Sequence, residues 1–207
     1  MSRFLGLTLA LALTILAAAA PGSTTLRSSR ALLDGLGRTG RLEVTLTREA
    51  GAERQGMPEL RGTLALEPPD CARLDVRGGE SITVRAEGGE WLQPALRQVI
   101  RLGPESAGNA LVWWRVMLDP KGTGIVERAL DAKRFLLVRT GEGAAASGPD
   151  SAWVTLGAKG LPNRLEISDG EGGRVGYRLG AWRFTPRRGR AAFRLSAPGG
   201  FEVVDLR

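Results

Sequence analysis

The feature that most constrains this chain is a period-two alternation of apolar and polar residues that recurs in short runs. Leu42, Val44 and Leu46 alternate with charged or hydroxyl residues, and later runs end at turn pairs such as Gly78-Gly79. Alternation of this kind places the apolar side chains on one face of a strand, and closely spaced turn residues are typical of an antiparallel meander. We therefore expect a sheet with one buried face.

Strand-like runs resume after residue 134 and continue to 206, among them 175–179, 182–184 and 193–195. Two segments favour helix instead. The first is Thr24 to Leu36, with Gly35 and Gly37 expected to end it, and the second opens at Gly103-Pro104 and stops at Asp119-Pro120. Residues 125–134 are interpreted as a turn followed by a helix. About eleven or twelve short strands against two or three helices predict a mainly β fold, a large curved antiparallel sheet or partial barrel.

The second helical segment is unusually apolar. Between Ala110 and Leu118 its only charged residue is Arg115. A helix that is apolar nearly all round must be buried or must cover an apolar surface.

The first twenty residues have the layout of a secretory signal peptide. Arg3 lies in a short basic region, an apolar run follows from Phe4 to Leu16, and four alanines precede Pro21. The apolar run is shorter than the roughly 20 residues of a spanning helix, so a membrane anchor is the less favoured interpretation. We expect cleavage of residues 1–20, a single domain over 21–207, and a periplasmic location.

Composition excludes several classes of enzyme. The chain has no His and one Cys, so it holds no Ser-His-Asp triad, no His-ligated zinc and no CxxC redox pair. No catalytic carboxylate pair stands out, although glycoside hydrolysis is not excluded by sequence. We expect no enzyme activity, no metal and no cofactor. Cys71 is interpreted as a small buried residue, with intermolecular pairing as the alternative.

The chain is basic through arginine, with 26 of its 29 basic residues Arg and a net charge of +7. A cluster near the C-terminus surrounds Trp182 and Phe184. Its predicted partner-facing residues are Arg183, Arg187, Arg188 and Arg190, with Arg194 close by. In an exported protein, an anionic lipid head group or an acidic partner suits such a cluster better than nucleic acid. The alternative is a solvated outer face of the sheet.

Several motifs together resemble those of the periplasmic lipoprotein carrier family, LolA. The run 193–205 resembles the family's ending, an aromatic-x-apolar pair, Pro-x-Gly and Val-x-Asp, and 161–169 resembles its LPxxLxxxD strand and turn. Residues 175–182, 67–76 and 89–99 match further strands in the correct order. Two departures stand out. The first strand, Leu42 to Leu46, lacks the usual Phe-x-Gln. Pro68, which Glu67 precedes, stands where many members carry an arginine that helps to hold the lid helices.

The resemblance implies an incomplete, half-open antiparallel β-barrel of about eleven strands covered by two or three α-helices, with an acyl-binding cavity between them. It also implies a monomeric carrier that shields the acyl chains of lipoproteins, or of a similar lipid cargo, between the inner and outer membranes. An inner-membrane release complex and an outer-membrane receptor would be its partners, without nucleic acid. Two alternatives are a regulatory module that senses lipid or lipoprotein, and a carrier of a polyene or glycolipid working beside an exporter.

The candidate site residues follow from the apolar faces. The candidates for the cavity lining are Leu42, Val44, Leu46, Leu64, Leu66, Leu74, Val76, Ile82, Val84 and Trp91. The lid candidates are Leu111, Trp114, Met117 and Leu118. For each of them, ordinary packing in a filled core is the alternative.

The signal-peptide interpretation makes a direct prediction. The exported protein should begin near Ala20 or Pro21, because signal peptidase cleaves after small residues. N-terminal mass analysis of the exported chain checks this, and an intact Met1 would contradict it.

Overall fold

The computed structural model describes residues 25–49, 60–110, 114, 117–118, 124–140, 150–168 and 173–206. The predicted signal peptide and the lid candidate Leu111 lie outside these ranges. No helix in the described part of the chain is long and apolar enough to cross a membrane.

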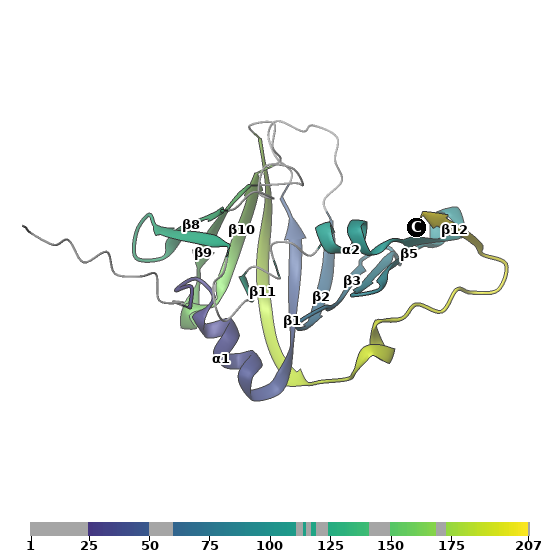
Figure 1. The fold of residues 1–207 in the computed structure, drawn as a ribbon, viewed down its shortest axis with the longest axis horizontal. Coiled ribbons are helices and arrows are strands. Elements are labelled where there is room, and N and C mark those ends of the chain that lie inside the picture. Colours follow the sequence, from purple (N-terminus) through teal and green to yellow (C-terminus); the bar gives the residue numbers. More distant parts are fainter. Residues whose placement is uncertain are drawn as a thin grey trace, which may run out of the picture.

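Among the described residues, twelve strands form one sheet, in the spatial order β12, β6, β5, β4, β3, β2, β1, β11, β10, β9, β8, β7 (Figure 1). In chain order the strands are β1 (Gly40–Arg48), β2 (Arg61–Glu67), β3 (Cys71–Val76), β4 (Ser81–Arg85), β5 (Gly88–Gln93), β6 (Gln98–Leu102), β7 (Ile125–Ala129), β8 (Arg134–Arg139), β9 (Ser151–Leu156), β10 (Pro162–Ser168), β11 (Arg174–Pro186) and β12 (Glu202–Leu206). Neighbours pair antiparallel except β12 and β6, which are parallel. Because β12 and β7 are the two edges, the sheet is open, and the predicted half-open, mainly β fold is confirmed.

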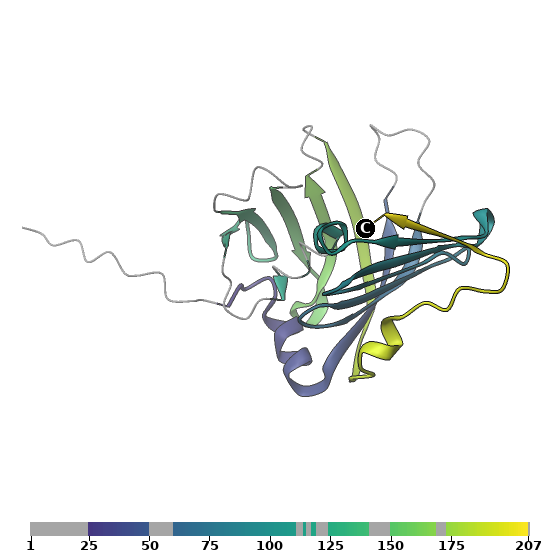
Figure 2. The ribbon, with the colours of Figure 1, turned by 45° about the vertical axis from the view of Figure 1, so that its right-hand side comes forward.

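The helices are α1 (Arg30–Thr39) and α2 (Pro104–Ala110), and short 3₁₀ turns are η1 (Pro94–Leu96), η2 (Ala158–Gly160) and η3 (Arg190–Phe193). α1 packs on β1 and β11, whereas α2 packs on β4 and β5. Figure 2 shows α2 end-on within the bend of the sheet. We call the face that contacts both helices the inner face and the opposite one the outer face.

The first predicted helix is shifted along the chain. It continues through Gly35 and Gly37 and ends at Gly40, whose φ of +85° suits a glycine C-cap. Gly35 instead allows α1 to approach β11 closely, because a Cβ at this position would lie 2.2 Å from the ring of Phe184. The missing side chain thus lets α1 rest on the sheet.

Three other local predictions need correction. Residues 125–129, predicted as turn and helix, form the edge strand β7, because each pairs with a residue of β8. Segments 175–179 and 182–184 belong to one strand, β11, which has an irregularity at Ala181 (φ +49°) where the register with β1 shifts. The predicted strand 193–195 is absent, since Phe193 ends η3 and is fully buried.

Residues 187–201, which we call the strap, cross the outer face from the end of β11 to β12, as the yellow segment of Figure 1 shows. The backbone N–H groups of Arg188 and Gly189 donate to the carboxylate of Glu67, at 2.6 and 3.2 Å. Further along, Arg85 Nη1 donates to the carbonyl of Phe193 at 2.7 Å. The strap is therefore held by side chains of the strands beneath it.

Glu67 also forms a buried ion pair with Arg41. Arg41 Nη1 lies 3.4 Å from Glu67 Oε1, and the two side chains are 7% and 6% exposed. The guanidinium of Arg41 lies 5.5 Å from the ring centroid of Phe193, which is a cation–π distance. The Glu67 carboxylate is thus the acceptor that joins β1, β2 and the strap.

Cys71 stands opposite Glu67 in the β2–β3 pair and is buried, as expected. Burial, together with the charge of the neighbouring Asp70 carboxylate and its hydrogen bond, raises the pKa of the Cys71 thiol to about 11. Such a thiol is a weak nucleophile near neutral pH.

Removing the Glu67 carboxylate should destabilise the fold. Glu67→Ala removes one of the two carboxylates that face the buried Arg41, the other being Glu43 at 2.8 Å, and leaves two backbone donors without an acceptor, so we expect a loss of about 2–3 kcal/mol in the free energy of unfolding. Arg183→Ala is the control, because its ion pair with Glu43 is at the surface, with the Arg183 side chain 68% exposed, and should change stability by less than about 1 kcal/mol. Urea unfolding measures both, and equal losses would contradict the assigned role of Glu67.

The raised pKa of Cys71 predicts slow alkylation. Between an ordinary pKa of 9.0 and one of about 11, the thiolate fraction at pH 8 falls about a hundredfold. Iodoacetamide should therefore label the native chain at least that much more slowly than the chain unfolded in urea. Comparable rates in the two states would show that the thiol is accessible and ionised.

Candidate functional site

All ten predicted lining residues lie on the inner face. Leu42 stands opposite Leu66, and Val44 opposite Leu64, in the β1–β2 pair. The same registration continues through β3, β4 and β5, where Ile82 stands opposite Trp91. Because directly opposed residues share a face, the sequence alternation has placed the whole set on the side of the helices.

One cross-strand line of apolar residues, which we call the inner row, spans the sheet from its centre to one edge. Its members, from β1 to β12, are Val44, Leu64, Leu74, Ile82, Trp91, Ile100 and Val204. Six inter-strand steps of ~4.8 Å give it a length of roughly 29 Å. Ile100 and Val204 are not among the predicted site residues, although Ile100 and Leu102 alternate with Arg101 in the sequence.

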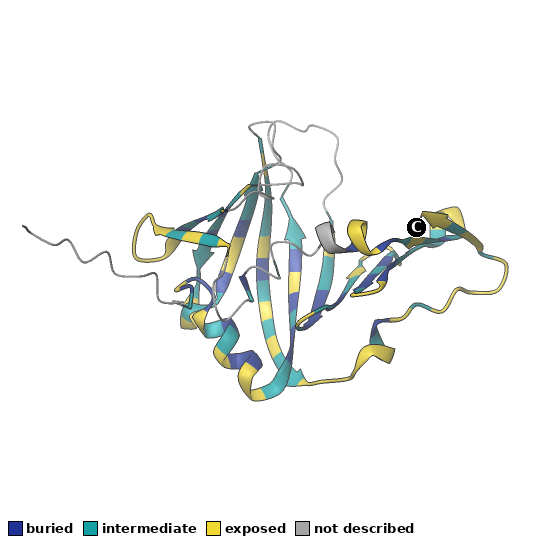
Figure 3. Cartoon of the chain, in the orientation of Figure 1, coloured by how far each residue is buried: buried dark blue, intermediate teal, exposed yellow. Residues whose placement is uncertain are grey.

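Burial declines along the inner row. Val44 is fully buried and Leu64 is 5% exposed, whereas the five members from Leu74 to Val204 are half-buried. Figure 3 shows the same trend, with buried residues in the central strands and exposed ones at β12. The end of the inner row nearest β12 is therefore an apolar surface that the described residues cover only in part.

The other end of the inner row belongs to a packed core. Six predicted lining residues are buried with Leu32 and Leu36 of α1 and Ala107 of α2. These six are Leu42, Val44, Leu46, Leu64, Leu66 and Val84. The remaining four, Leu74, Val76, Ile82 and Trp91, are half-buried. The sequence set thus divides into a filled part and a partly open part.

The lid candidates lie against the same core where they are described. Met117 is 1% exposed, and Trp114 and Leu118 are partly buried against the core. The N–H of Leu118 donates to the carbonyl of Trp114 at 2.9 Å, which is the helical spacing. Trp114, Met117 and Leu118, the described lid candidates, therefore pack against the core of the inner face.

Trp91 is fixed in orientation by a polar contact. Its indole Nε1 donates to Glu80 Oε2 at 3.3 Å, so the polar edge of the ring has a partner. A tryptophan held in this way presents a large and rigid apolar surface.

The predicted basic cluster is largely engaged with the strap and its surroundings. Arg183 Nη2 donates to Glu43 at 2.8 Å and Arg190 Nη2 to Asp70 at 2.7 Å. Arg187 Nη2 donates to the carbonyl of Pro68 at 3.4 Å, and the backbone N–H of Arg188 donates to the carboxylate of Glu67. These arginines therefore have intramolecular partners, which the sequence alone did not show.

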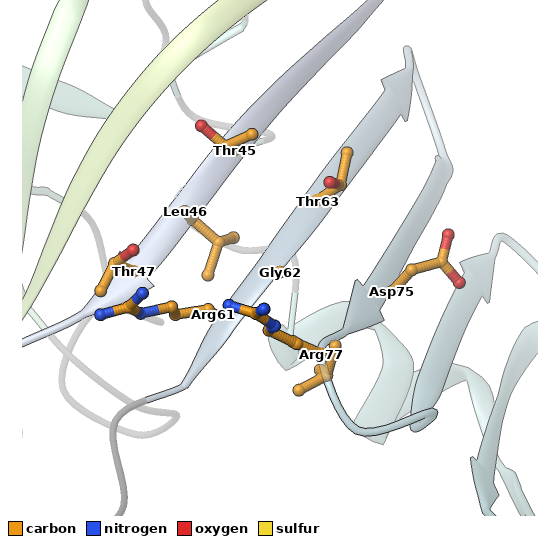
Figure 4. A pocket seen from close by; sticks show the side chains of 9 residues that line it. Thr45, Leu46, Thr47, Arg61, Gly62, Thr63, Asp75 and Arg77 are labelled. Atoms are coloured by element: carbon orange, nitrogen blue, oxygen red, sulfur yellow. The ribbon is translucent and has the colours of Figure 1, made fainter.

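A pocket of about 410 Å³ lies along β1, β2 and β3 (Figure 4). It is lined by Thr45, Leu46, Thr47, Arg61, Gly62, Thr63, Asp75, Val76 and Arg77. By alternation, its hydroxyl and charged residues belong to the outer face, whereas Leu46 and Val76 belong to the inner face. Sequence analysis missed this pocket, because its members come from three strands whose register no local motif reveals.

No metal site adds to these features. Within the described ranges, no group of three or more His, Cys, Asp or Glu side chains could hold a metal ion.

No protein-family model matches this sequence, and no curated protein sequence matches it. Solved structures with a similar fold include an uncharacterized conserved protein from Thermus thermophilus, which is 14% identical, with a TM-score of 0.49 over 86% of this chain and 99% of that one. A LolA superfamily protein from Nitrosomonas europaea is 9% identical, with a TM-score of 0.41 over 81% and 97% of the two chains. The Mycobacterium tuberculosis lipoprotein LppX is 13% identical, with a TM-score of 0.40 over 78% and 95%. One of these names is that of the family that the sequence motifs resemble.

Proposed function

We propose that this chain is an exported, non-enzymatic carrier that shields the acyl chains of a lipoprotein, or of a similar lipid, on its inner face. The observation that carries the proposal is the half-buried end of the inner row, from Leu74 to Val204. Five apolar side chains in cross-strand register form a strip roughly 19 Å long, at ~4.8 Å per strand. An extended acyl chain is of comparable length.

The energetics of such a cargo suit this surface. Burying one methylene stabilises by ~0.8 kcal/mol, so moving an acyl chain of roughly 16 carbons from water into an apolar site is favourable by on the order of 13 kcal/mol. A partly open apolar strip can shield that surface and still release the chain. Aliphatic residues and one tryptophan provide contact without demanding a particular head group.

The cellular setting belongs to the same proposal. Cleavage of residues 1–20 would place the chain in the periplasm, between the two membranes that a lipoprotein must cross. An inner-membrane complex that loads the carrier and an outer-membrane receptor that unloads it would be its partners.

Two neighbouring residues of β12 provide a matched test. Val204 lies on the inner face opposite Ile100, whereas Val203 lies on the outer face opposite Val99. A carboxylate beside a bound acyl chain must be desolvated or must displace the chain. We expect Val204→Asp to weaken uptake of a fluorescent fatty acid at least fivefold and Val203→Asp to leave it within twofold of wild type.

Circular dichroism on both variants must show an unchanged fold, which a strand at the sheet edge should tolerate. Equal effects of the two substitutions would place acyl binding elsewhere. Absence of uptake by the wild-type chain would remove the carrier proposal.

A further inference from the structure

A polar row runs beside the open end of the inner row, on the same face of the sheet. Gln93 lies two residues after Trp91 on β5 and therefore faces the same side. Gln98 of β6 stands opposite Gln93, and Glu202 of β12 stands opposite Gln98. Glu80 precedes β4 and reaches the same side, because its carboxylate accepts from the indole of Trp91. We call Glu80, Gln93, Gln98 and Glu202 the polar border.

The polar border follows the part of the inner row that the core leaves partly open. Its members come from the turn before β4 and from β5, β6 and β12, and the last four members of the inner row lie on β4, β5, β6 and β12. Two residues along each strand separate the two rows, a spacing of roughly 7 Å at ~3.4 Å per residue. Glu202 is exposed and the other three members are half-buried. A molecule that lies on the inner row can therefore reach the polar border.

The opposite flank of the inner row is apolar. Val84 and Leu102 both stand opposite Gly89, and Leu206 stands opposite Leu102. The helix α2 packs on this flank, since a Cβ at Gly89 would lie 3.6 Å from that of Ala107. The open part of the inner face thus has an apolar side and a polar side, which is the arrangement that an amphiphilic molecule requires.

The side chains of the polar border offer both donors and acceptors of hydrogen bonds. Gln98 Nε2 donates to Gln93 Oε1, so among the described residues the N–H donors of Gln93 and the carbonyl oxygen of Gln98 are left for a ligand. Glu80 Oε2 accepts from Trp91 Nε1 at 3.3 Å, and its second oxygen is left in the same way.

The polar border also carries negative charge. Neither Glu80 nor Glu202 forms an ion pair within the described ranges. The turn between β5 and β6 holds a cation, Arg97, but this side chain extends towards the strap, since its Nη2 would lie 3.0 Å from a Cβ at Gly200. Like charges that are brought together weaken binding, so the polar border disfavours an anionic group.

We propose that the polar border binds the uncharged, hydroxyl-bearing head group of the lipid whose acyl chain lies on the inner row. This inference rests on the proposed function, because it names the class of lipid that the carrier accepts. The inner row itself makes no demand on the head group, whereas the polar border does. A hydroxyl donates one hydrogen bond and accepts others, so it matches amides and carboxylates alike. An ammonium group only donates, and it would leave the amide N–H groups without an acceptor.

The first experiment compares three lipids that share one chain length, monododecanoylglycerol, dodecanoate and dodecylamine. Each competes, below its critical micelle concentration, with an apolar fluorescent dye bound to the mature chain. A hydrogen bond contributes about fivefold in affinity, and like charge adds to the discrimination. We therefore expect the glycerol ester to bind about tenfold more tightly than dodecanoate, and more tightly than dodecylamine.

The second experiment changes the polar border. Gln93→Leu with Gln98→Leu removes both amides at similar volume, so binding of monododecanoylglycerol should weaken about tenfold and that of dodecanoate by less than about twofold. Glu80→Gln keeps an acceptor for Trp91 but removes a charge, so dodecanoate should bind severalfold more tightly. Arg101→Leu is the control, because Arg101 is exposed on the outer face of β6. It should leave all three affinities within about twofold of wild type.

Circular dichroism on every variant checks the fold. Equal affinities of the wild-type chain for the glycerol ester and for dodecanoate, tighter binding of dodecylamine, or an unchanged preference in the double variant would overturn the head-group site alone. Where the double variant fails to fold, Glu80→Gln decides, because an unchanged affinity for dodecanoate contradicts the site. Binding of none of the three lipids by the wild type would remove the carrier proposal and the head-group site with it.

Discussion

The pairing of β1 with β2 on one side and with β11 on the other is the constraint on which the rest of the structure depends. β1 lies near the middle of the sheet, and its alternation of buried and more exposed residues decides which face of every other strand turns towards the helices. A slip of one residue in either pairing would turn a whole strand's apolar set outwards, so Leu42, Val44 and Leu46 together fix the register. α1 then packs on the face that they define, through the contact of Gly35 with Phe184.

The outer face carries the ion-paired charges, and the strap turns part of that face into a second small interior. Arg41 and Glu67 can be buried there because each finds partners: Glu43 for the cation, and the backbone of residues 188–189 for the carboxylate. Phe193 supplies the apolar side of this interior. By crossing to β6, the strap also brings β12 into parallel pairing at the sheet edge, which two adjacent strands joined by a short turn could not do.

The sequence predicted the alternating strands, the open sheet and the shared face of the ten lining residues, because all of these depend on local periodicity. It failed where a distant contact decides the outcome. Phe193 lies in an alternating run, yet it belongs to the strap and is buried against the outer face rather than paired in a strand. Residues 125–129 become a strand only because β8 lies alongside. Arg183 and Arg190 look available in the sequence, but their acceptors, Glu43 and Asp70, lie more than a hundred residues away along the chain. The same holds for the pocket at Arg61 and Arg77, whose walls meet only through the register of three strands.

The apolar strip proposed to hold an acyl chain and the ion-paired side chains of the sheet lie on opposite faces, and this separation has a physical consequence. An acyl chain on the inner row would be bound by removal of apolar surface from water, which depends weakly on ionic strength, whereas the exposed ion pairs of the outer face are screened by salt beyond about 10 Å at 0.1 M. Release of the cargo would then require a change on the inner face itself, in the residues around Trp91 and Val204 that the core leaves partly open, since a change in the outer ion pairs alone would not alter their burial.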